Sequence, residues 1–155
     1  MKIREFMTSK VVTVQLDDKL SVVKDIFDNS NFHHLLVVED DKLFGVISDR
    51  DLLKAISPNL DTKVVTYRDL ATLNKRVHLI VSRTPITLSA DHTVTDAAAL
   101  FCRFRISCIP IVDDEFRPVG IITWRDVLRT MIPCSARVSC NKVDPCALLG
   151  SPVED

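Results

Sequence analysis

The side chains of this chain best suited to chemistry are two hydroxyl and carboxylate pairs with the same spacing. Ser48 stands three positions before Asp51, and Thr123 stands three positions before Asp126. Each pair follows a short apolar stretch and opens a helical pattern. A helix N-terminus presents unpaired backbone N–H groups and a partial positive charge, so it can hold a phosphate. The same spacing is that of a capping box, in which the acid folds back onto the cap residue. Anion binding and helix capping are therefore alternative explanations of both pairs.

The two pairs belong to a longer internal repeat. Residues 45–53, GVISDRDLL, return as residues 120–128, GIITWRDVL. The strand-like residues 12–14 fall on 86–88, the helix-spaced residues 20–27 on 94–101, and the apolar run 35–39 on 109–113. Each copy is therefore predicted to contain a lead-in segment, a strand, a helix, a strand hairpin and a final helix. A glycine is expected where the last strand of each copy begins.

The repeat predicts the organisation of the whole chain. The first repeat is expected at residues 1–55, a structured linker with a helix near 68–73 at 56–74, and the second repeat at 75–132. Beyond residue 132 the periodicity ends, so the tail, 133–155, is expected to be disordered or loosely docked. A half of roughly 55 residues is marginally stable alone, so the two copies are expected to pack against each other.

Composition narrows the classes of partner. The chain of 155 residues carries 20 Lys and Arg against 21 Asp and Glu, a net charge of -1, which is not the basic footprint of a nucleic-acid binder. No apolar run reaches the ~20 residues of a membrane span, and the N-terminus lacks the features of a signal peptide. We therefore expect no nucleic-acid or membrane partner and a cytoplasmic location.

Neither the cysteines nor the histidines have the spacing of a metal site. Cys134, Cys140 and Cys146 are six residues apart, whereas zinc ligands usually pair at gaps of two to four residues. His33 and His34 are neighbours on a predicted strand, so their side chains are expected to point to opposite faces. We expect free thiols and no metal.

No catalytic constellation is recognisable either. Cys102 and Cys108 have no general base nearby in the sequence, and Cys108 is better explained as a small apolar filler. The three glycines are too scattered to form a phosphate-binding loop. We therefore expect that the chain is not an enzyme.

The repeated order of elements, with Gly-h-h-Ser/Thr-x-x-Asp at the last strand-to-helix junction (h, apolar), resembles the tandem CBS-domain pair, or Bateman module. VHLIVS at 77–82, TPIT at 84–87 and IPIV at 109–112 add to the resemblance, which covers about residues 1–132. It implies an α+β fold of two β-α-β-β-α repeats packed about a pseudo-two-fold axis. It also implies a regulatory, stand-alone module that binds an adenosine-containing ligand between its repeats, forms a homodimer, and controls a protein that the sequence does not identify.

The resemblance also implies the residues of two sites. The acid of each motif matches the residue that binds ribose hydroxyls, and a carboxylate can accept both hydrogen bonds of a cis-diol. The hydroxyl residue and the arginine between them would meet ribose or phosphate, and the strand entries would hold adenine. The first site would comprise Lys10, Val11, Val12, His34, Leu35, Ser48, Arg50 and Asp51. The second would comprise Thr84, Pro85, Ile86, Cys108, Ile109, Pro110, Thr123, Arg125 and Asp126.

The second site follows the family pattern more closely. It has Thr84 and Pro110, where the first has Lys10 and Leu36. Trp124 could stack on a base or serve packing or a dimer contact. The sequence thus favours a non-enzymatic sensor of an adenine nucleotide of the AMP, ADP or ATP type, with the second site preferred. The alternative is a structural dimerisation or interaction module whose clefts hold no ligand.

Overall fold

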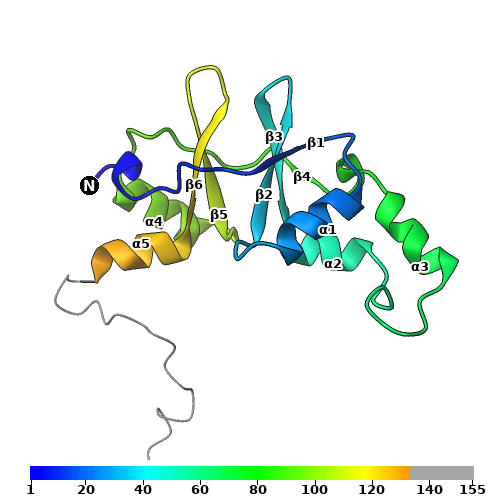
Figure 1. Ribbon diagram of the computed structural model, residues 1–155. Coiled ribbons are helices and arrows are strands. Elements are labelled where there is room, and N and C mark those ends of the chain that lie inside the picture. Colours follow the sequence, from blue (N-terminus) through cyan, green and yellow to red (C-terminus); the bar gives the residue numbers. More distant parts are fainter. Residues whose placement is uncertain (133–155) are drawn as a thin grey trace, which may run out of the picture.

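The computed structural model of the chain describes residues 1–132, which form two β-sheets and their covering helices (Figure 1). The predicted α+β class and the two repeats are confirmed. The tail at 133–155, including the three cysteines expected to be free thiols there, lies outside the described residues. The boundaries predicted for the repeats and the linker stay predictions.

The first repeat has every predicted element. Strand β1 runs parallel to β2, and β2 pairs antiparallel with β3 in a hairpin. The apolar positions of the first helix follow its inner face, where Leu20 and Val23 are buried. The elements are β1 (Thr13–Gln15), α1 (Leu20–Asp28), β2 (His34–Glu39), β3 (Lys42–Ser48) and α2 (Asp49–Ala55).

The second repeat matches the first except at its opening strand. The strand expected at 86–88 is reduced to a single parallel bridge between Leu88 and Ile111. Two features oppose a longer strand there: Thr84 has a positive φ of 51°, and Pro85 has no N–H to donate. The other elements are α4 (Val94–Arg103), β5 (Cys108–Val112), β6 (Pro118–Thr123) and α5 (Trp124–Met131).

Each lead-in segment packs on the opposite repeat, which the repeat pattern alone does not indicate. The first, the short 3-10 helix η1 (Ile3–Glu5), places Ile3 in the core formed by α4, β5 and β6. The second, η3 (Val77–Leu79), places Val77 in the core formed by α1, β2 and β3. Figure 1 shows the N-terminal segment beside α4 before β1 crosses to the other hairpin. The two repeats are therefore tied together by exchanged segments.

The repeated glycines make room for these exchanged segments. Gly45 lies inside β3, where it pairs with Arg83 of β4 (Ser82–Arg83), and Gly120 lies inside β6. The expectation that each glycine opens its strand is therefore wrong. A Cβ on Gly45 would lie 2.4 Å from the Ser82 carbonyl oxygen, and one on Gly120 would lie 2.6 Å from the Met7 sulfur. The motif glycine is thus explained by the close approach of the crossing chain.

The two hairpins also meet directly. Leu36 and Leu43 of the first hairpin pack with Val112 of the second in a small buried cluster. Its apolar edge includes Val11 and Ile121. The expected packing of one copy on the other is therefore present, and it leaves the strand ends and helix starts of both repeats near one another (Figure 1).

The segment between the two repeats contains two short helices. It contains α3 (Tyr67–Ala71) and the 3-10 helix η2 (Thr72–Asn74). The buried carboxylate of Asp69 accepts hydrogen bonds from the hydroxyls of Ser57 and Thr66, which lower the pKa of Asp69 to about 2. Among residues 1–132, no helix has the length and apolar character that crossing a membrane requires.

Candidate ligand-binding cleft

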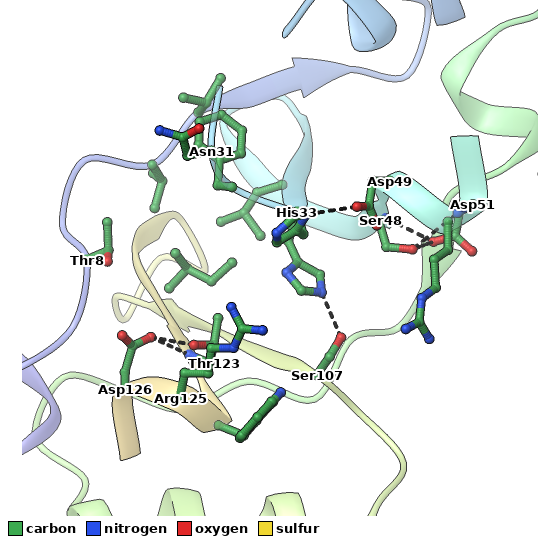
Figure 2. A pocket seen from close by; sticks show the side chains of 18 of the residues that line it. Thr8, Asn31, His33, Ser48, Asp49, Asp51, Ser107, Thr123, Arg125 and Asp126 are labelled. Carbon is green, nitrogen blue, oxygen red and sulfur yellow. Dashed lines mark hydrogen bonds and ion pairs between the residues drawn. The ribbon is translucent and has the colours of Figure 1, made fainter. Parts of the chain in front are cut away.

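A cleft of about 860 Å³ lies where the two repeats face each other. This volume is within the usual range for a small-molecule site, ~300–1,000 Å³. Both hydroxyl and carboxylate pairs line it, and Figure 2 shows Ser48 and Asp51 on one side with Thr123 and Asp126 on the other. Two junctions that are distant in sequence therefore face one cleft.

The first junction is a complete capping box at the start of α2. The Asp51 backbone N–H donates to Ser48 Oγ at 3.2 Å, and the Ser48 backbone N–H donates to Asp51 Oδ2 at 2.9 Å. The Ser48 hydroxyl donates to the same carboxylate oxygen at 2.7 Å. Within residues 1–132, Asp51 Oδ1 accepts no hydrogen bond and forms no ion pair, so it is available to a ligand.

The second junction, at the start of α5, has a similar cap but a different neighbour at its carboxylate. Asp126 Oδ2 accepts the Thr123 N–H at 2.8 Å and the Thr123 hydroxyl at 2.7 Å. The Thr123 hydroxyl in turn faces the Asp126 backbone N–H, so this junction also has the form of a capping box. The other carboxylate oxygen, Oδ1, meets Arg129 at 3.3 Å. A ligand hydroxyl at Asp126 would therefore compete with a resident guanidinium.

Capping and ligand binding are thus compatible at the first junction. One oxygen of Asp51 satisfies the helix start, while the other is free to accept a hydrogen bond from a ribose hydroxyl. Removing this carboxylate would remove the cap together with the free acceptor oxygen. The two explanations that the spacing left open are not mutually exclusive.

His34 links the two repeats across the cleft. Its Nε2 lies 2.7 Å from the Ser107 hydroxyl, which belongs to the loop before β5 (Figure 2). Burial is the main cause that lowers the pKa of His34, and the nearby His33 adds to it, against the opposing effects of Asp49 and Asp51. A neutral imidazole at this position can donate or accept a hydrogen bond without adding charge.

His33 faces the same cleft, contrary to the prediction that the two histidines point to opposite faces. Its Nδ1 lies 2.8 Å from Asp49 Oδ2 (Figure 2). The alternation rule fails because β2 begins only at His34, so His33 is still in the preceding turn. Among residues 1–132, no group of three or more metal-ligating side chains is placed to hold an ion.

Most of the first predicted site is assembled in this cleft. The exception is Leu35, which is fully buried in the first core, while its neighbour Leu36 lines the cleft. The side chains of a strand alternate, so only one of the two leucines can face this space. The predicted residues that line the cleft are Lys10, Val11, Val12, His34, Ser48, Arg50 and Asp51.

The second predicted site is divided. Thr123, Arg125 and Asp126 line the cleft, whereas its proposed adenine wall does not. Cys108 is buried, and burial raises the pKa of this thiol to about 12, so the cysteine stays neutral. Ile109 and Pro110 are fully buried. The predicted residues outside the cleft are Thr84, Pro85, Ile86, Cys108, Ile109 and Pro110.

Several cleft residues were not predicted to lie there. Trp124 was noted for possible stacking; it lines the cleft, and the Arg125 guanidinium lies 5.5 Å from its ring centre. Lys54 sits one helical turn after Arg50, a spacing that could have indicated a shared face. The remaining lining residues were not predicted, and no local sequence signal singles them out. They come from the lead-in, the turn before β2, the start of α2, the loop before β5, strand β6 and the second turn of α5: Thr8, Asn31, Phe32, Asp49, Ser107, Ile121 and Arg129.

A comparison with protein families supports the repeat architecture. The model described as "CBS domain" matches the chain twice, at residues 3–58 and 77–133. An uncharacterized protein of Methanocaldococcus jannaschii is 32% identical over 132 residues. The match covers 85% of this chain but only 44% of that relative, so the chain spans less than half of the relative's length.

Known structures share the fold. The CBS domain pair of protein MJ0100, in complex with 5'-methylthioadenosine and S-adenosyl-L-methionine, is 27% identical with a TM-score of 0.69. That match covers 85% of this chain and all of the other. The cytosolic domain of the Mg²⁺ channel MgtE, in complex with ATP, is 25% identical with a TM-score of 0.65, over 81% of this chain and 46% of that one.

Proposed function

The chain belongs to the CBS-domain family, and from this we propose that it is a non-enzymatic regulatory module that binds an adenine nucleotide between its two repeats. The observation that carries the proposal is the single cleft onto which both helix-start junctions open. A ligand in this cleft would contact both repeats at once. Its binding free energy could therefore depend on how the repeats are packed.

In the proposed complex, adenine lies against the strand entry formed by Lys10, Val11 and Val12. The backbone there can bind the base edge, and the aliphatic parts can cover its face. The ribose hydroxyls bind the free oxygen of Asp51, and a phosphate meets Arg50 at the start of α2. This places the ligand in the first site. The second site, preferred on its sequence pattern, stays a prediction.

The comparisons support the class of ligand. Both structural relatives named above hold adenosine-containing molecules, one with a thioether and a sulfonium and one with a triphosphate. An adenosyl group is the part that these ligands share. We therefore propose the adenosine moiety as the common recognition element here as well.

Signalling would follow from differential affinity. A ligand shifts an equilibrium between two packings only by the difference in its affinity for them. The His34 to Ser107 hydrogen bond spans the cleft, so ligand entry would alter a direct contact between the repeats. We propose that a partner protein senses this change in packing.

Calorimetric titration with AMP, ADP, ATP and S-adenosylmethionine tests the proposed function. Micromolar binding, about −8 kcal/mol, is expected for at least one of them. A thermal-shift measurement on the same samples should show a matching increase in melting temperature. No heat and no shift at millimolar concentration of every ligand would overturn the proposal.

A structural dimerisation module is the alternative, and two observations favour it. The helix starts are capped by side chains of the chain itself, and the final helices expose apolar residues. Leu53 is 67% exposed on α2, and at the end of α5 Leu128 and Met131 are 48% and 71% exposed. We propose that these helices form a homodimer interface in either case.

Sedimentation separates the two possibilities when it is combined with titration. Leu53→Glu with Leu128→Glu should convert a dimer to a monomer, because charged side chains are unfavourable in an apolar interface. A dimer that binds no nucleotide would support the structural module. A wild-type protein that is monomeric at every concentration would contradict the homodimer.

A further inference from the structure

Four basic side chains line the cleft without an acidic partner. Lys10, Arg50, Lys54 and Arg125 are all exposed, and among residues 1–132 none of them forms an ion pair. Arg129 differs, since it lies 3.3 Å from Asp126. The four therefore hold positive charge that the protein itself does not neutralise.

The charge of the cleft is opposite to that of the chain. Five lysines and arginines and three aspartates line it, which leaves a formal +2 with histidine neutral, whereas the whole chain carries -1. The three carboxylates also have partners already. Asp51 and Asp126 accept helix-cap hydrogen bonds, and Asp49 lies 2.8 Å from His33. The excess positive potential is thus concentrated where a ligand would enter.

The four cations come from separate elements of both repeats. Lys10 precedes β1, Arg50 and Lys54 lie on successive turns of α2, and Arg125 lies on the first turn of α5. A single phosphate carries only about two negative charges on one compact group, fewer than the four cations that line the cleft. A chain of phosphates carries several charges along its length and can contact more than one element.

We propose that the cleft selects a nucleoside triphosphate, over the monophosphate and over a cationic adenosyl ligand such as S-adenosylmethionine. This inference rests on the proposed function, because it assumes that the adenosine moiety binds at Asp51. The triphosphate would extend from Arg50 across the cleft toward Arg125, with Lys10 and Lys54 beside it. It would be the bridge between the repeats that a monophosphate is too short to provide.

Binding measurements along a ligand series test this selectivity. Calorimetry with adenosine, AMP, ADP, ATP and S-adenosylmethionine should give affinities that increase with the number of phosphates. We expect ATP to bind at least about tenfold more tightly than AMP at low salt, a difference of about 1.4 kcal/mol. Raising the salt should reduce this ratio, because exposed ion pairs are screened.

Charge-removal variants identify the residues responsible. Lys54→Ala and Arg125→Ala should each weaken ATP binding several-fold and leave adenosine binding within about twofold, because neither side chain is placed against the adenine or the ribose. Lys63→Ala is the matched control, since this exposed lysine in the linker does not line the cleft and should leave both affinities unchanged. Melting temperatures of all three variants establish that they fold.

The outcomes are distinct. If AMP or S-adenosylmethionine binds as tightly as ATP, the triphosphate selectivity is wrong while nucleotide binding stands. The same conclusion follows if Lys63→Ala weakens ATP binding as much as Lys54→Ala does. If no ligand of the series binds at millimolar concentration, the proposed function fails and the selectivity fails with it.

Discussion

The two helix-start junctions are close copies in sequence but differ in what surrounds them. At the first, Asp51 caps α2 with one oxygen and keeps the other free, and the strand entry before β1 lines the same cleft. At the second, Arg129 contacts Oδ1 of Asp126, and the strand entry at 84–86 lies outside the cleft. A repeated motif therefore does not produce two equal sites.

Both copies of the motif begin a helix. The segments around each copy determine whether a strand entry lines the cleft beside that helix start. In the first repeat, the chain entering β1 reaches the cleft directly after the crossing lead-in. In the second, the corresponding stretch has the positive φ at Thr84 and forms no strand before Leu88. The strand entry of the second repeat therefore lies outside this cleft, while the preference for the second site stays a prediction.

The largest expected difference between the repeats concerns their glycines. Gly45→Ala should destabilise the fold by about 2–3 kcal/mol, because its Cβ would meet the Ser82 backbone, which cannot easily move. Gly120→Ala should cost about 1 kcal/mol or less, since the Met7 side chain that it meets is flexible. Urea denaturation of both variants measures the free energies of unfolding.

Equal losses in the two glycine variants would contradict the assignment of the motif glycine to crossing-segment contact. A larger loss for Gly120→Ala would do so as well. Val81→Ala in the Gly45→Ala background provides a control. It removes the other atom that the new Cβ would meet, at 2.5 Å, and should recover only part of the stability, because the Ser82 carbonyl remains.

The next difference concerns the two carboxylates. Asp51→Ala and Asp126→Ala should each lose about 1 kcal/mol of stability through the cap. Asp51→Ala should also weaken adenosine binding at least about tenfold, through the lost ribose contact. Asp126→Ala should weaken adenosine binding less, because Arg129 already contacts Oδ1 of Asp126.

Calorimetry with adenosine and thermal denaturation on the same two variants separate the effects. Asp96→Ala is a matched control, because it removes the same type of cap from α4 at a position outside the cleft. It should reduce stability and leave binding unchanged. Loss of binding in Asp126→Ala with normal binding in Asp51→Ala would place the ligand in the second site instead.

A smaller effect is expected at the hydrogen bond between the repeats. Ser107→Ala should cost about 1 kcal/mol, because His34 loses its partner across the cleft. Burial lowers the pKa of His34 from 6.5, so protonation favours the unfolded chain. The stability that the neutral imidazole provides is therefore complete above pH ~6.5 and is lost as the pH falls through the lower, folded-state pKa.

Urea denaturation between pH 7.5 and 5 tests whether stability falls as the pH is lowered. The free energy of unfolding should fall with pH in the wild type and in Ser107→Ala, and fall less in His34→Gln, which lacks the titrating group. The same pH dependence in His34→Gln as in the wild type would show that His34 is not responsible.

Much of the fold could be predicted from the sequence because its signals are local. The helical spacing at 20–27 and 94–101, and the paired apolar runs, predicted helices and hairpins that the structure confirms. The exchange of the lead-in segments could not be predicted. Ile3 and Val77 have the same pattern and fit either core, and only the path of the chain decides between the cores.

The site residues that belong to the repeated motif could be predicted from the sequence. Those placed by strand register or by turns could not. The hydroxyl and carboxylate spacing located both helix starts. Strand register determines whether Leu35 or Leu36 faces the cleft. A shift of one residue exchanges the two faces, and the sequence does not fix the register that closely. Ser107 and Asn31 enter the cleft from turns, where no periodic pattern exists to place them.

A crystal structure of the protein grown with ATP would test the central claim most directly. The predicted result is one nucleotide in the cleft, with its ribose hydroxyls on Asp51, its adenine against residues 10–12, and its phosphates between Arg50 and Arg125. Nucleotide bound instead against residues 84–86 and Cys108, with no ligand contact at Asp51, would contradict it.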